Sequence, residues 1–109
     1  MKIINKVTEE SYVQWIENFV KTVISKADLE CKEVVIDDIE FSECIFLIID
    51  GDEYDIRTWN FHTIKTDNNG NPCAEVVDYT LFKMVMDNEQ CGHGEEICNG
   101  HVRIEWSNE

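Results

Sequence analysis

The chain has 109 residues, 43% of them hydrophobic and 29% charged, a composition typical of one small globular domain. Its 9 basic and 23 acidic side chains give a formal net charge of −14, whereas small soluble domains usually carry a charge of about 2–8 in magnitude. Such acidity argues against direct binding to nucleic acid or to an anionic membrane, because both require positive protein surface. We therefore expect one domain, residues 1–109, that binds neither.

The expected compartment is the cytoplasm. Residues 1–6 lack the long apolar run of a secretory signal, and no stretch approaches the roughly 18 apolar residues of a membrane-spanning helix. The five cysteines are an odd number, which suits free thiols in a reducing compartment better than a disulfide framework.

A helix is predicted near the N-terminus, over residues 9–28. Thr8 suits the N-cap position, and Lys26 suits the negative end of the helix dipole. The apolar side chains recur at three- and four-residue spacing, which places them on one broad stripe. The stripe comprises Tyr12, Trp15, Ile16, Phe19, Val20, Val23, Ile24 and Ala27.

After the helix the apolar period changes to two, which is typical of strands. The expected strands cover residues 32–41, 44–49, 54–65, 73–86 and 101–106. A slip in the apolar phase between Ile56 and Trp59 predicts a β-bulge. The stretch 73–86 also fits one face of a helix, and 88–100 is predicted to be a polar loop. Short turns favour antiparallel neighbours. The predicted fold class is therefore α+β in two layers, with the N-terminal amphipathic helix packed on an antiparallel sheet of about five strands.

The negative charge is concentrated in residues 28–55, where eleven acidic side chains face Lys32 alone. Carboxylates on neighbouring strands lie about 4.8 Å apart and repel one another. One interpretation is a solvated face that resists aggregation. The other is a surface for a basic partner, on which carboxylates take the place of phosphates and steer association. The candidate partner-binding residues are Glu33, Asp37, Asp38, Glu40, Glu43, Asp50, Asp52, Glu53 and Asp55.

In size and acidity, the chain resembles small phage-encoded inhibitors that mimic nucleic acid, anti-CRISPR proteins of that type among them. The resemblance rests on size and charge over the whole chain and on no family motif. It implies a non-catalytic inhibitor in the host cytoplasm that binds a basic nucleic-acid-binding protein, such as a nuclease or effector. An immunity protein that neutralises a basic nuclease toxin is the alternative.

A second constellation lies near the C-terminus, where Cys91, His93, Cys98 and His101 fall within eleven residues. A tetrahedral zinc site takes four such ligands, so a zinc-stabilised adaptor domain is a further alternative, although the C-x-H-x4-C-x2-H spacing is unusual. No other cofactor is expected.

Trp59 and Phe61 are predicted to lie in the core, with an exposed partner contact as the alternative. The chain holds no complete catalytic motif, so we expect no enzyme.

Overall fold

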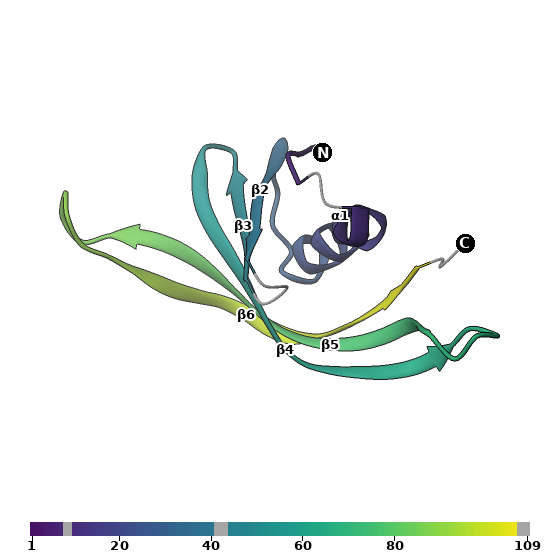
Figure 1. Cartoon of the computed structure of the whole chain (residues 1–109). Coiled ribbons are helices and arrows are strands. Elements are labelled where there is room, and N and C mark those ends of the chain that lie inside the picture. The colour runs from purple at the N-terminus through teal and green to yellow at the C-terminus, as the bar shows by residue number, and fades with distance from the viewer. Residues whose placement is uncertain (8–9, 41–43, 107–109) are drawn as a thin grey trace.

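The computed structural model describes residues 1–7, 10–40 and 44–106, with helix side chains described from residue 15 onward. Six strands in these residues form one sheet in sequence order (Figure 1). The elements are β1 (Lys2–Asn5), α1 (Glu10–Lys26), β2 (Glu33–Glu40), β3 (Cys44–Ile49), β4 (Asp52–Thr66), β5 (Pro72–Met86) and β6 (Gly92–Glu105). β1 pairs in parallel with β2, and every later pair is antiparallel.

The predicted fold class is wrong, because the described residues are dominated by a mixed sheet of six strands with one short helix, rather than by a helix on five antiparallel strands. β1 has only four residues, too few for a two-residue period to be recognised. It is parallel to β2 because α1 returns the chain to the starting end of the sheet.

The predicted polar loop at 88–100 is also wrong, because β6 begins at Gly92. Every residue from Gly92 to Ile97 is exposed. With neither face of the strand buried, its sequence needs no alternation of apolar and polar residues, and the usual strand signal is missing.

Several local predictions are confirmed. The helix occupies Glu10–Lys26 within the predicted 9–28, and Cys44–Ile49 is a strand with the predicted bounds. Residues 73–86 form a strand and not a helix. The β4 bulge lies at Asn60, just beyond the predicted phase slip: the register shifts between Trp59 and Phe61, and Asn60 has a φ of 51°.

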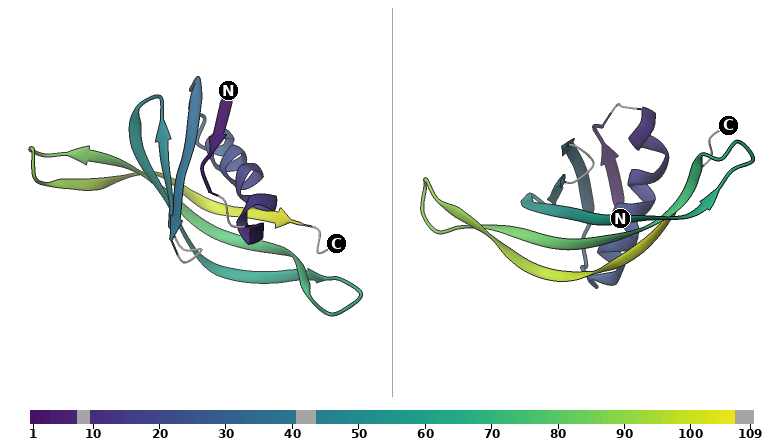
Figure 2. Two further views of the ribbon diagram at one scale, coloured as in Figure 1. Left: turned by 45° about the horizontal axis from the view of Figure 1, so that its top comes forward. Right: turned by 60° about the horizontal axis from the view of Figure 1, so that its bottom comes forward.

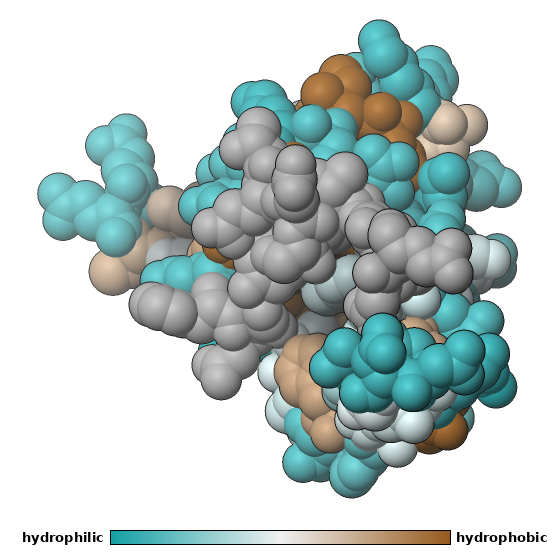
Figure 3. Space-filling view, turned by 45° about the vertical axis from the view of Figure 1, so that its right-hand side comes forward, coloured by the Kyte–Doolittle hydropathy of each residue, from teal (hydrophilic) through white to brown (hydrophobic). Residues whose placement is uncertain are grey.

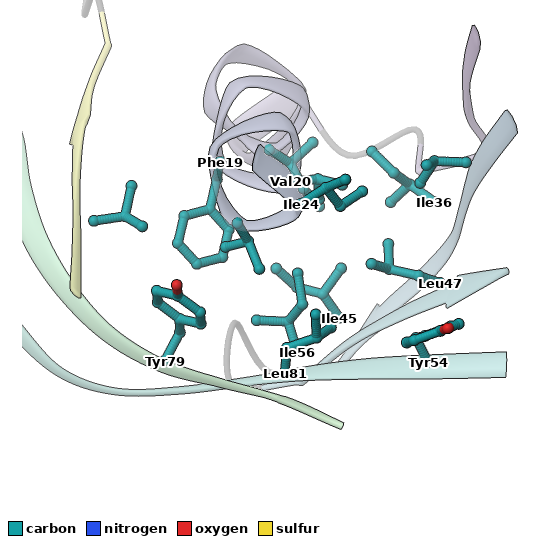
Figure 4. Close-up of a cluster of buried hydrophobic side chains, with 14 of the residues drawn as sticks. Phe19, Val20, Ile24, Ile36, Ile45, Leu47, Tyr54, Ile56, Tyr79 and Leu81 are labelled. Atoms are coloured by element: carbon teal, nitrogen blue, oxygen red, sulfur yellow. The ribbon is translucent and has the colours of Figure 1, made fainter. Parts of the chain in front are cut away.

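The core lies between α1 and one face of the sheet (Figure 4). Phe19 is fully buried, and its ring makes edge contacts with Trp15 at 5.6 Å and with Tyr79 at 6.2 Å between centroids. Strands β2 to β6 supply the apolar layer that packs against the helix. The face of each strand that carries these apolar residues is therefore the face covered by α1. The largest fully buried sheet residues are Tyr79, Ile36, Ile45, Leu47, Ile56, Leu81, Val34 and Val77.

The long strands β4, β5 and β6 curve beneath α1 and extend beyond it (Figures 1 and 2). The β5–β6 hairpin projects to one side of the helix, and the β4–β5 hairpin projects to the other, giving overall dimensions of 52 × 25 × 25 Å. Hydrophilic residues cover most of the described surface in Figure 3, with hydrophobic residues gathered in separate areas. In the described residues, α1 thus covers only the central part of one face of the sheet.

Candidate functional site

The sheet face opposite α1, called the open face below, is built from residues that alternate with the core positions. Ile45 and Ile56 are paired across β3 and β4 and point into the core. Because successive strand residues point to opposite faces, their neighbours point to the open face. The register brings six such residues from β3, β4 and β5 together: Cys44, Phe46, Asp55, Arg57, Thr80 and Phe82.

A cleft of about 760 Å³ lies on the open face. Strands β2 to β6 all contribute to it, so it depends on the registers of four strand pairs. Its lining combines aromatic rings, three carboxylates and one guanidinium, which gives it a net negative charge. The lining residues are Glu40, Cys44, Phe46, Asp55, Arg57, Thr58, Trp59, Thr80, Phe82 and Glu96.

Asp55 is the most buried charged side chain of the cleft, with only 8% of its surface exposed. Burial raises the pKa of this carboxyl group, the Glu53 carboxylate raises it further, and Arg57 opposes both effects. Among the ion pairs of the described residues, none includes Asp55. A buried carboxylate that lacks a cation within 4 Å is costly to ionise, so Asp55 is suited to receive a positive group from outside.

Arg57 and Cys44 flank this carboxylate in the cleft. The Cζ atom of Arg57 lies 5.5 Å from the centre of the Phe82 ring, within the range of a cation–π contact. Burial raises the pKa of Cys44, and the Asp55 and Glu40 carboxylates add to that rise against the opposing effect of Arg57. Because the thiolate is the nucleophilic form, Cys44 is a poor nucleophile at neutral pH.

The open face collects five of the nine predicted partner-binding carboxylates. Asp38 pairs with Phe46 and Glu40 with Cys44 across β2 and β3, which places both acids on this face. Glu33 and Glu53 alternate with core residues of β2 and β4. The five are Glu33, Asp38, Glu40, Glu53 and Asp55, of which Glu40 and Asp55 line the cleft.

Three predicted carboxylates point elsewhere or lie outside the description. Asp37 is the extra residue of a bulge in β2, and its Oδ1 lies 3.4 Å from Nζ of Lys6. Asp52 pairs with Ile49 on the helix side of the sheet, and its Oδ2 lies 3.7 Å from Nζ of Lys83. Glu43 lies outside the described residues.

Asp50 has a structural role. Its carboxylate accepts hydrogen bonds from the backbone N–H groups of Lys32 and Glu33 at 2.8–3.1 Å. The bond from Glu33, followed by that from Lys32, lowers the pKa of this carboxyl group. Asp50 therefore ties the β3–β4 turn to the start of β2.

The cleft also contains residues that sequence reasoning did not select. Glu96 lies directly opposite Phe82 across β5 and β6, in a stretch predicted to be a loop. Trp59, predicted to be a core residue, is 44% exposed at the cleft, and Phe61 is 39% exposed. The prediction that these two aromatic residues lie in the core is therefore wrong, and a partner contact through them stays a prediction. The only signal for their exposure was the phase slip beside Trp59.

The structure does not bring the four candidate zinc ligands together. Nδ1 of His93 lies 2.9 Å from Oδ2 of Asp87, Cys98 packs against the core, and His101 is exposed further along β6. Along an extended strand, the eight steps from His93 to His101 span roughly 26 Å. The described part of the chain holds no cluster of three or more metal-ligating His, Cys, Asp or Glu side chains. Zinc binding by Cys91 and the other three residues stays a prediction.

No protein-family model, curated protein or solved structure matches the chain. The helix in the described residues is too short and too polar to cross a membrane. Function is therefore inferred from the chemistry of the cleft.

Proposed function

We propose that the protein is a non-catalytic binding protein whose open-face cleft receives a lysine or arginine side chain from a basic partner. The observation that carries this proposal is the carboxylate of Asp55, which lines the cleft, is 8% exposed and takes part in no described ion pair. An incoming cation would offset the cost of holding that charge in a buried position.

The surroundings of Asp55 favour a cationic side chain over a metal ion or an anion. Glu40 and Glu96 reach the cleft from β2 and β6 and add two negative charges. Trp59 supplies an exposed aromatic ring on which an ammonium or guanidinium group can rest. Such a pocket, with an aromatic anchor and a few converging charges, is typical of an interaction hot spot.

In its most concrete form, the partner is a nucleic-acid-binding protein, and this chain inhibits it by occupying its phosphate-binding surface. Supporting this form is the net charge of −14, together with the five carboxylates that share the open face. Long-range attraction between such a face and a basic groove speeds association and weakens with salt. A defence enzyme and a nuclease toxin are the two partners that the size and acidity of the chain suggest.

The proposal is tested by capture on the immobilised protein from a lysate of the source cells at about 50 mM and 500 mM salt. Bound protein is then challenged with duplex DNA or RNA. We expect a basic protein that is retained at low salt and released by either nucleic acid or high salt. Retention that nucleic acid does not compete for would contradict the phosphate-mimic form of the proposal.

Two double variants with the same change in net charge locate the contact. Glu40→Lys with Glu96→Lys reverses charge in the cleft, whereas Glu30→Lys with Glu89→Lys reverses two exposed acids outside it. The cleft variant should lose at least tenfold in affinity for the captured protein. The affinity of the control should change by no more than about threefold, because charges away from the contact act only at long range and are screened by salt. Equal losses would show that no particular site is used.

A further inference from the structure

The outer edge of β6 is a second surface on which a partner could bind, through the backbone N–H and C=O groups of an edge strand. In the described residues, β6 has one neighbouring strand, β5, and it forms an edge of the sheet. The backbone N–H of Trp106 donates to the carbonyl of Cys73 at 3.0 Å, which fixes which residues face β5. Because hydrogen-bonded and non-hydrogen-bonded positions alternate in antiparallel pairs, every second residue before Trp106 points its N–H and C=O outward. These residues are Asn99, His101, Arg103 and Glu105.

This edge lacks the usual protection against strand addition. From Cys98 to Glu105 the pairing with β5 is continuous, because the bulge at Ile97 lies just before it. The segment contains no proline or lysine, and its two charged residues, Arg103 and Glu105, form an ion pair with each other. Its eight residues therefore present a regular row of backbone donors and acceptors.

A pocket of about 270 Å³ opens beside the same edge, between α1 and the end of β6. The buried side chains of Phe19 and Ile104 line it together with Trp15. Asn18 and Thr22 contribute from the helix, and Arg103 and Glu105 contribute from β6. A strand added to β6 would direct every second side chain to the helix side of the sheet. The side chain next to Ile104 would enter this pocket, where Trp15, Phe19 and Ile104 favour an apolar group.

This edge has two candidate occupants, a second copy of the chain and a segment of another protein, and charge decides between them. A second copy of the chain would bring a net charge of −14 against another −14. Within the segment Arg103 and Glu105 form an ion pair with each other, and two further acids of β6, Glu95 and Glu96, lie just before it. Like charges on adjacent strands are destabilising. In a strand of alternating basic and apolar residues, the basic side chains are instead attracted by the acidic protein, and an apolar side chain fills the pocket.

We infer that residues 98–105 of β6 and the adjoining pocket form a β-augmentation site for an extended partner segment of alternating basic and apolar residues. Backbone hydrogen bonds would supply affinity, and the pocket would supply side-chain selectivity. This site lies on the helix side of the edge and is separate from the open-face cleft, so it does not rest on the proposed function.

The inference is tested with the blocked heptapeptide Lys-Val-Lys-Leu-Lys-Val-Lys and its counterpart in which Glu replaces every Lys. Amide hydrogen exchange, followed by NMR on the whole protein, reports binding residue by residue. The basic peptide should slow exchange at least tenfold at His101, Arg103 and the two other outward-facing amides, and the acidic peptide should have no effect. Protection by both peptides alike, or at none of these amides, would overturn the inference.

Variants separate edge pairing from simple charge attraction. Arg103→Pro removes an outward N–H and leaves the hydrogen bonds to β5 intact, so binding of the basic peptide should fall at least tenfold. Arg103→Gln keeps the N–H but removes a positive charge and the ion pair with Glu105, so binding of the basic peptide should not weaken. If Arg103→Pro does not fold, Asn18→Trp, which narrows the pocket from the helix, should weaken binding similarly. Unchanged binding in Arg103→Pro or, where that variant does not fold, in Asn18→Trp would overturn the inference.

Two other outcomes would assign the edge differently. A peptide that shifts only the NMR signals of Asp55 and Trp59 would be bound in the cleft alone and would overturn the edge site without affecting the proposed function. Sedimentation that shows a dimer of the free protein, abolished by Arg103→Pro, would make a second copy the occupant and overturn the basic segment as its partner.

Discussion

The guanidinium of Arg57 lies over the ring of Phe82, with Cζ 5.5 Å from the ring centre, although Asp55 is two residues away on the same strand face. Asp55 lies directly opposite Phe82 in the β4–β5 register. The arginine is therefore supported by an aromatic face, and in the described residues it forms no ion pair within 4 Å of Asp55. This arrangement leaves the Asp55 carboxylate without an ion-pair partner among the described residues.

Asp55→Asn should stabilise the isolated protein at neutral pH while it weakens partner binding. Burial raises the pKa of Asp55 in the folded state, so the fold loses stability as the pH rises from the unfolded pKa to that raised pKa, and the loss is complete above it. We expect a Tm a few degrees higher at pH 7. The gain should vanish near pH 3, below the ordinary aspartate pKa of about 3.9, where both states are protonated. Thermal unfolding across this pH range provides the measurement, and a lower Tm at pH 7 would contradict it.

Cys44 provides a probe of the electric potential in the cleft that needs no identified partner. Positively and negatively charged thiosulfonate reagents are compared at this residue, with mass spectrometry to distinguish it from the other cysteines. The ratio of the positive to the negative reagent's rate should fall severalfold in Glu40→Gln with Glu96→Gln, because these carboxylates attract the cation. The same ratio at Cys91, an exposed thiol at the hairpin tip, serves as the internal reference. An unchanged ratio at Cys44 would show that the cleft is not electrostatically selective.

His93 should stabilise the tip of the β5–β6 hairpin in a pH-dependent way. Its hydrogen bond to Asp87 and the charge of that carboxylate raise its pKa. Because the folded pKa exceeds the unfolded value of about 6.5, the stabilisation is complete below pH 6.5 and is lost as the pH rises through the folded pKa. NMR titration should find a pKa above 6.5 in the native chain and a lower one in Asp87→Asn. Amide protection factors at Gln90 and Cys91, whose N–H groups donate to the Asn88 side chain, should decline over the same pH range.

Phe19→Ala should cost about 3–5 kcal/mol in the free energy of unfolding, the usual range for a buried phenylalanine. The side chain is fully buried and touches the rings of Trp15 and Tyr79. Phe61→Ala is the matched control, because that ring is 39% exposed, and it should cost less than about 1 kcal/mol. Urea unfolding of the two variants gives both values. A loss below about 1 kcal/mol for Phe19→Ala would mean that α1 does not stabilise the sheet.

The α1 stripe and the β3 segment Cys44–Ile49 could be recognised from the sequence, because both depend on residues close together in the chain. β1 and the first half of β6 could not. The four residues Lys2–Asn5 become a strand only through pairing with β2, and Gly92–Ile97 only through pairing with β5. Hydrogen bonds between segments distant in sequence leave little trace in local periodicity, and the fold class was consequently predicted wrongly.

The candidate site also has one part that the sequence determined and another that only the tertiary structure decided. The amino-acid sequence alone determined that the protein is strongly acidic and that residues 28–55 carry most of the excess charge. Only the tertiary structure decided which carboxylates share a face, because the single extra residue at Asp37 shifts every later β2 side chain relative to β3. Likewise, Glu96 reaches the cleft through the β5–β6 register, 41 residues beyond Asp55 in the chain. Charge is a property of the residues themselves, whereas a binding site depends on strand registers, which are set by pairing across the whole sheet.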